Sequence, residues 1–192
     1  ANVGVGVNTL AALSQSSGTN TYNVAVGYNA GKLVTTGVEN VLVGGLAGDA
    51  LTTGSYNVAV GNGALTTEDT GGRNVAIGSR ALNVLNYDGD GYNIAIGYDA
   101  GLNMSTGVRN TLIGGLAGDA LTTGSDNVAV GYGALTTENA HGRNTAVGFN
   151  SLATLDAGAN GLNVAIGYGA GALMSTGIQN TILGANAGDA LT

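Results

Sequence analysis

The sequence predicts an all-β fold, a parallel β-solenoid (a β-roll) of about eleven coils with 17–19 residues each. Two observations support this prediction. A short phrase recurs eleven times along the 192 residues: Asn, two or three small or β-branched residues, then Gly. The composition is also typical of short strands and tight turns, because 36 residues are Gly, the apolar fraction of 44% includes many Val and Ala, and Pro is absent.

Positions within the repeat are counted here from its Asn, which is position 0. The repeats begin at Asn2, Asn23, Asn40, Asn57, Asn74, Asn93, Asn110, Asn127, Asn144, Asn163 and Asn180. Position +3 is aliphatic and position +4 is Gly in every repeat, and position +7 is Ala in nine of the eleven. We therefore interpret residues 1–192 as one repeat array, and we expect it to be a fragment of a longer fibre.

A longer period lies on top of the short one. Four repeats of 17, 17, 17 and 19 residues make a 70-residue unit, and residues 40–68 are nearly identical to residues 110–138. The units span residues 23–92, 93–162 and, in part, 163–192. This near identity indicates that the array was extended by copying four coils at once.

Each repeat predicts one coil. The Val-rich phrase between Asn and Gly has strand composition, and we expect a second, weaker strand at about positions +7 to +13. Stacked coils place identical positions about 4.8 Å apart, so Asn and Gly should form ladders at the corners of the coil. The predicted corner residues include Asn23, Gly27, Asn40, Gly44, Asn57, Gly61, Asn93, Gly97, Asn127, Gly131, Asn163 and Gly167.

The apolar positions of the strand indicate an oligomer. Residues at +2 and +3 point to opposite faces of a strand. If the aliphatic residue at +3 fills the interior, position +2 faces outward, although it is Ala in most coils and Leu42, Leu112 or Ile182 in every fourth coil. An outward apolar face requires a cover, and we expect a homotrimer to supply it.

The phrase at residues 127–137, Asn-Val-Ala-Val-Gly-Tyr-Gly-Ala-Leu-Thr-Thr, resembles two groups of fibrous proteins. It is similar to the head repeats of YadA-like trimeric autotransporter adhesins. It is closer still to repeats of phage tail-fibre proteins that end in an endosialidase-type C-terminal chaperone. The resemblance covers the whole chain and implies a left-handed, homotrimeric β-roll in an extracellular fibre, on a virion or a bacterial cell surface.

The composition excludes several other classes of protein. Twelve acids against five bases give a net charge of −7, so nucleic-acid binding is not expected. No apolar run approaches the roughly 20 residues of a membrane span, so we expect no membrane insertion. The absence of Cys removes disulfides and thiolate metal sites. No general acid, base and nucleophile occur together, so the chain is not expected to be an enzyme.

The residues with possible metal or phosphate chemistry favour structural roles. The one His, His141, is interpreted as a solvated loop residue. Residues 86–91 look faintly like a calcium loop, but Asp88 and Asp90 become Gly158 and Asn160 one unit later, which is what a turn tolerates. The recurring Asp49, Asp119 and Asp189 are interpreted as turn or capping residues. Gly-rich stretches lack a Walker lysine. We therefore expect no metal and no cofactor.

Two kinds of surface ladder remain as candidate binding sites. Thr pairs such as Thr52–Thr53 and Thr122–Thr123 could form an ice-binding array, but they shift position in the third coil of each unit and vanish in the fourth. Aromatic rings follow the Gly at +4 and could stack on sugars or pack between chains. These rings are Tyr28, Tyr98, Tyr132, Phe149 and Tyr168.

Three functions follow as hypotheses. The first is a shaft or receptor-binding segment of a phage tail fibre, with a cell-surface glycan or host surface protein as a possible partner. The second is a bacterial adhesin head that binds host matrix or glycans. The third is an ice-binding solenoid.

Overall fold

A computed structural model describes residues 1–14 and 20–191 of the chain. Within them the fold is an all-β parallel solenoid of about ten turns, with one three-residue strand in each repeat and no helix. The strands are β1 (Val3–Val5), β2 (Val24–Val26), β3 (Val41–Val43), β4 (Val58–Val60), β5 (Val75–Ile77), β6 (Ile94–Ile96), β7 (Thr111–Ile113), β8 (Val128–Val130), β9 (Thr145–Val147), β10 (Val164–Ile166) and β11 (Thr181–Leu183).

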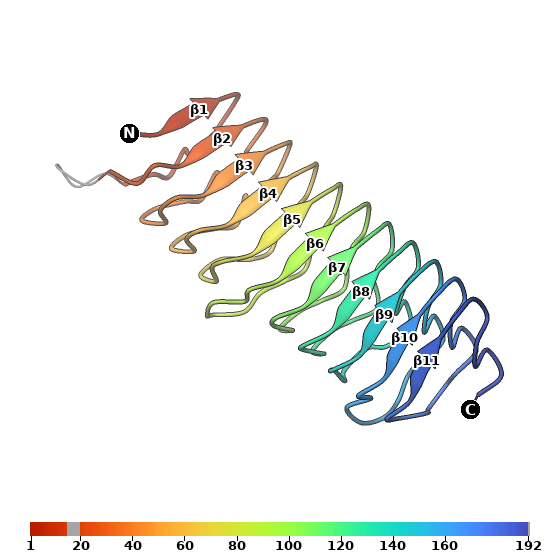
Figure 1. Cartoon of the computed structure of the whole chain (residues 1–192). Helices are drawn as coiled ribbons and strands as arrows, with labels where there is room; N and C mark the ends of the chain where they lie inside the picture. Colours follow the sequence, from red (N-terminus) through yellow and green to blue (C-terminus); the bar gives the residue numbers. More distant parts are fainter. Residues whose placement is uncertain (15–19, 192) are drawn as a thin grey trace.

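The strands form one parallel sheet in chain order, and the two chain ends lie at opposite ends of the stack (Figure 1). Their register pairs identical repeat positions: Val24 lies beside Val41, and Val41 beside Val58. The strand register is the same for coils of 17 and of 19 residues, because the two extra residues of the longer coil lie in the loop. The predicted stacking is therefore confirmed.

The Asn ladder is continuous along the stack. In all ten steps the side-chain Oδ1 of one position-0 Asn accepts the backbone N–H of the next, at 2.8–3.3 Å. In most coils the side-chain Nδ2 also donates to the carbonyl at position +14 of the same repeat, as Asn40 does to Gly54 at 2.9 Å. These Asn are buried from Asn23 to Asn163. The ladder thus satisfies backbone groups at a corner that water does not reach.

Gly at +4 is required by both backbone conformation and space. Gly114 has φ of +132°, which L side chains rarely adopt, and a Cβ there would lie 2.5 Å from the carbonyl oxygen of Gly131 in the next coil. The same arrangement holds at Gly27 and Gly44. Adjacent coils approach so closely at this corner that no side chain fits between them.

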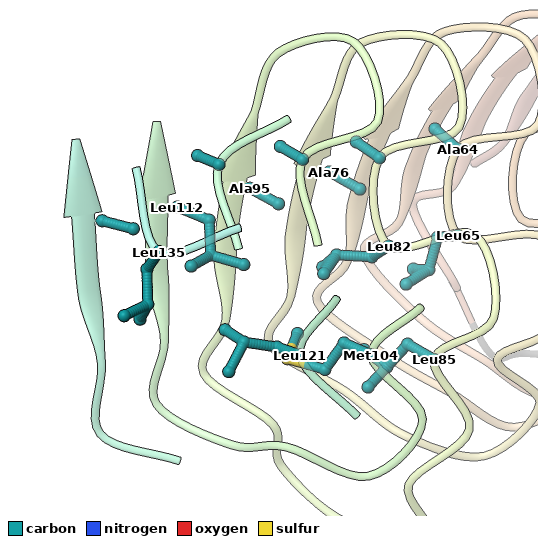
Figure 2. Close-up of a cluster of buried hydrophobic side chains, with 14 of the residues drawn as sticks. Ala64, Leu65, Ala76, Leu82, Leu85, Ala95, Met104, Leu112, Leu121 and Leu135 are labelled. Carbon is teal, nitrogen blue, oxygen red and sulfur yellow. The ribbon is translucent and has the colours of Figure 1, made fainter. Parts of the chain in front are cut away.

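The strand faces are the reverse of those predicted. Position +2 points into the coil and is fully buried, as for Ala25 and Leu42, whereas the aliphatic residue at +3 faces outward, as Ile113 does. The physical reason is space. Ala at +7 and Leu, Val or Met at +8 or +11 also fill the interior, so in most coils only Ala fits at +2 (Figure 2).

The second strand predicted at positions +7 to +13 is also wrong. Those residues form turns, because left-handed residues at position +8, such as Gly48 (φ +54°) and Leu65 (φ +54°), interrupt an extended backbone. Backbone hydrogen bonds between coils nevertheless continue there, for example from Leu65 N–H to Ala81 C=O at 3.0 Å. The coil is therefore held to its neighbours on the turn side without a second sheet.

Candidate functional site

The outer face of the sheet carries apolar side chains along the whole stack of strands. Positions +1 and +3 of every strand point outward, and both are aliphatic in most coils, with Thr at +1 in β7, β9 and β11. We call these two rows the outer stripe. Stacking eleven strands makes it about 50 Å long. With a width of about 10 Å it covers on the order of 500 Å², which is at the upper end for a free monomer surface.

An aromatic stack lies beside one edge of the outer stripe, at position +5. The rings of Tyr132 and Phe149 are 5.7 Å apart, and those of Phe149 and Tyr168 are 5.1 Å apart, with interplanar angles of 15° and 7°. All three rings are exposed. Because the three belong to consecutive coils, they form a flat ladder of rings on the surface.

The structure does not bring all five predicted rings together. Tyr28 and Tyr98 are exposed, but their neighbours at position +5 are not aromatic. Gly115 stands between Tyr98 and Tyr132, so the stack ends there. Tyr98 instead accepts a hydrogen bond on its hydroxyl from Arg80 Nη2 at 2.6 Å, and the guanidinium lies 5.2 Å from its ring centre.

A second ladder, at position −1, was missed by the sequence analysis. The guanidinium of Arg73 lies 4.7 Å from the ring centre of Tyr56 and 5.8 Å from that of Tyr92, so the cation sits between two rings. Arg73 also pairs with Asp90 at 2.8 Å. The sequence does contain a pattern that predicts this ladder, because Tyr or Arg directly precedes the Asn in several repeats.

The ladder at position −1 continues with an ion pair. Arg109 pairs with Asp126 at 2.6 Å, and this guanidinium holds the pKa of the Asp126 carboxyl below its ordinary value. Both side chains are exposed, so the pair contributes little to stability. Charged and aromatic groups therefore border the outer stripe along this edge.

The Thr pairs use their hydroxyls within the solenoid. Thr52 Oγ1 donates to the carbonyl of Asp69 at 3.0 Å, and Thr122 Oγ1 donates to that of Asn139 at 3.0 Å. Thr35 makes the same contact to Thr52 at 3.1 Å. These hydroxyls connect adjacent coils, which supports a structural role for the ladder.

The acidic residues singled out from the sequence lie in separate environments. Asp88 accepts a hydrogen bond from Thr70, whereas Asp90 pairs with Arg73, so the two do not converge on one point. Asp49 and Asp119 are partly buried, and this burial raises the pKa of both carboxyls. In the part of the chain that is described, these carboxylates form no common ligand set.

Two further acids are fully buried, and the sequence analysis missed both. Glu68 and Glu138 occupy position +11, where most other coils place Leu, Val or Met. Glu68 Oε1 accepts the backbone N–H of Gly71 at 2.7 Å, and Oε2 accepts that of Tyr87 at 3.2 Å. Burial raises the pKa of Glu68. The Glu thus satisfies amides near the 19-residue coil, where the two extra residues interrupt the regular ladder.

No protein-family model, curated protein or solved structure matches this chain. Over residues 1–14 and 20–191 there is no helix long and apolar enough to cross a membrane.

Proposed function

We propose that this chain is a structural and attachment segment of a trimeric extracellular fibre, in which three copies pack their outer stripes against one another. The outer stripe is the observation that carries the proposal. A row of Val and Ile about 50 Å long is costly to leave in water, at about 25 cal/mol per Å² of apolar surface. Three identical chains around a common axis cover the stripe along its whole length.

The proposed oligomer differs in one respect from the one expected from the sequence. Position +2 is buried inside the coil, as at Ala59, so it is not available to another chain. The same argument now applies to positions +1 and +3, whose side chains face outward, as those of Ile94 and Ile113 do. The left-handed coil remains part of the proposal, and it rests on the resemblance to fibre repeats.

Light scattering after size exclusion tests the trimer. Three copies of the 18.6-kDa chain have a mass of about 56 kDa. Ile113→Glu places a charge in the middle of the outer stripe and should give monomers, whereas Leu33→Glu, at an exposed apolar residue outside the stripe, should remain trimeric. A monomeric wild-type chain would refute the proposed packing.

Within this fibre, we propose that the stack of Tyr132, Phe149 and Tyr168 contributes a surface for cell-surface glycans or a host surface protein. Flat exposed rings suit the apolar faces of sugars. A glycan screen with wild type and Phe149→Ala tests this role, with the isolated Tyr28→Ala as the matched control. If Phe149→Ala instead dissociates the trimer, the stack packs between chains.

We place this fibre on a phage tail, because the repeats at residues 127–137 resemble those of tail fibres most closely. The alternative is a bacterial adhesin head. The gene sequence beyond residue 192 separates the two: a chaperone and tip favour the tail fibre, and a coiled-coil stalk with a membrane anchor favours the adhesin. Thermal hysteresis tests the third hypothesis, ice binding, which the internally bonded Thr hydroxyls do not support.

A further inference from the structure

Glu138 is a fully buried carboxylate on the turn side of the solenoid. Its Oε1 accepts the backbone N–H of His141 at 3.1 Å, and its Oε2 accepts that of Ala157 in the next coil at 3.3 Å. A carboxylate has about four acceptor positions, so each oxygen retains a free lone pair. The buried charge therefore has remaining capacity for a cation.

The imidazole of His141 lies against this carboxylate. Its Nδ1 is 3.3 Å from Glu138 Oε1 and forms an ion pair with it only when the imidazole is protonated. In the neutral tautomer whose Nδ1 carries no proton, this buried nitrogen has no hydrogen-bond partner. A nitrogen without a partner in such a place is costly unless a further group satisfies it. The carboxylate of Asp156, at the surface, completes a group of three: one ligand atom from each residue lies within 4.8 Å of the other two.

The 70-residue repeat supplies the same site without two of these residues. Glu68 corresponds to Glu138, but Gly71 and Asn86 stand where His141 and Asp156 stand. The backbone is alike in the two copies: Asn86 N–H donates to Ser105 C=O at 2.7 Å, and Asp156 N–H donates to the equivalent Ser175 C=O at 2.7 Å. The coil therefore folds without the imidazole and the second carboxylate, so folding does not explain them.

We propose that Glu138, His141 and Asp156 bind one divalent transition-metal ion of the Zn²⁺ class. Imidazole and carboxylate are both ligands of Zn²⁺, with bond lengths of about 2.0–2.2 Å, so neighbouring ligand atoms of a tetrahedral site are about 3.4 Å apart. The separation of 3.3 Å between His141 Nδ1 and Glu138 Oε1 matches such an edge. The third ligand comes from Asp156, and solvent at the exposed side supplies the fourth.

The bound ion would connect two coils. Glu138 and His141 belong to the coil that begins at Asn127, and Asp156 belongs to the coil that begins at Asn144. The ion would also satisfy the buried Nδ1 and offset the charge of the buried carboxylate. It would therefore stabilise the folded array by binding energy that the unfolded chain lacks.

Calorimetric titration of the tag-free protein with ZnCl₂ tests the proposal, and His141→Gly and Asp156→Asn are the matched variants. Each change installs the residue that the chain itself carries at the equivalent place, Gly71 or Asn86, so both variants should fold. We expect one Zn²⁺ per wild-type chain. Each single variant should bind at least about tenfold more weakly, and the double variant should lose the site.

Two further measurements use the same proteins. Because His141 is the only His in the chain, its imidazole NMR signals report directly on Nδ1 and should shift on addition of Zn²⁺. Zn²⁺ should also raise the melting temperature of wild type but not of the double variant. Equal Zn²⁺ affinity of wild type and double variant, or unmoved imidazole signals at saturation, would overturn the site.

Discussion

The Asn ladder predicts a large and local effect for Asn110→Ala. Asn110 is fully buried, its Oδ1 accepts the backbone N–H of Asn127 at 3.0 Å, and its Nδ2 donates to the carbonyl of Gly124 at 2.9 Å. Alanine lacks both the Oδ1 acceptor and the Nδ2 donor. The buried N–H of Asn127 and the buried carbonyl of Gly124 therefore lose these hydrogen bonds. Each such group costs about 1–3 kcal/mol, so we expect a loss of about 2–6 kcal/mol in the free energy of unfolding.

The matched control is Asn62→Ala. Asn62 is exposed and makes a single bond of 3.2 Å to the carbonyl of Gly45, so its removal should change stability by less than about 0.5 kcal/mol. Both variants should be compared with wild type by guanidinium unfolding, followed by circular dichroism, at one fixed protein concentration. Concentration matters because an oligomer would couple assembly to unfolding.

Hydrogen exchange locates the effect within the array. In Asn110→Ala the amide of Asn127 should lose protection by about 30-fold or more, since each 1.4 kcal/mol is a factor of ten. The amide of Asn57, which donates to Asn40 at 2.9 Å one unit earlier, should keep its protection. If Asn110→Ala is as stable as Asn62→Ala, or Asn127 stays protected, the ladder does not stabilise the stack as argued.

Three other predictions follow from single positions. Gly114→Ala should lower the melting temperature far more than Gly158→Ala. At Gly114 φ is +132° and the new Cβ would lie 2.5 Å from a carbonyl oxygen, whereas at Gly158 φ is +65° but the space is open, so the cost there is about 1 kcal/mol. Leu112→Ala should cost about 2–5 kcal/mol in guanidinium unfolding, because the side chain is fully buried. Burial raises the pKa of Glu68 above 4.5, so the folded state binds this proton more tightly than the unfolded chain does. The contribution of Glu68 to stability should therefore be greatest below pH 4.5 and should decrease as pH rises through the folded-state pKa. Thermal melts across this pH range measure the profile, and Glu68→Gln should flatten it.

The coil register could be predicted from the sequence because two residue types enforce it. Only Gly fits at Gly114, and only a short amide bridges one coil to the next at Asn110. The inward and outward faces could not be predicted in the same way. Strand alternation states that Leu112 and Ile113 face opposite sides, but the choice between them depends on how much volume the turn residues already occupy.

The candidate site was only partly predictable, for a similar reason. Whether two rings stack depends on the residue one coil away, so Phe149 joins Tyr132 while Gly115 separates Tyr98 from it. Glu138 was missed because a charged residue in a repeat suggests a solvated turn. Its burial becomes understandable only once the two amides it accepts are placed beside it.

The interior explains why the array repeats in units of four coils. In the coil that begins at Asn93, position +8 is Gly101, and Leu82 from one neighbouring coil and Leu112 from the other fill the space above and below it. The same arrangement recurs one unit later, where Leu152 and Ile182 enclose Gly171. At position +8 two coils with Leu alternate with two coils with Gly: Leu65 and Leu82 are followed by Gly101 and Gly118. This order has a period of four coils, so copying four coils at once keeps it intact.

Such a unit lets the surface change while the interior is retained. The residues that correspond to Tyr132 and Phe149 in the preceding unit are Asn62 and Ser79, so the stack that these two rings form with Tyr168 at the start of the third unit has no counterpart one unit earlier. The imidazole of His141 is likewise added to a site that carries Gly in the earlier copy. Both proposed binding surfaces therefore fall within residues 132–168. A fragment of the array that retains residues 93–192 should then keep glycan and Zn²⁺ binding, whereas residues 1–92 should show neither.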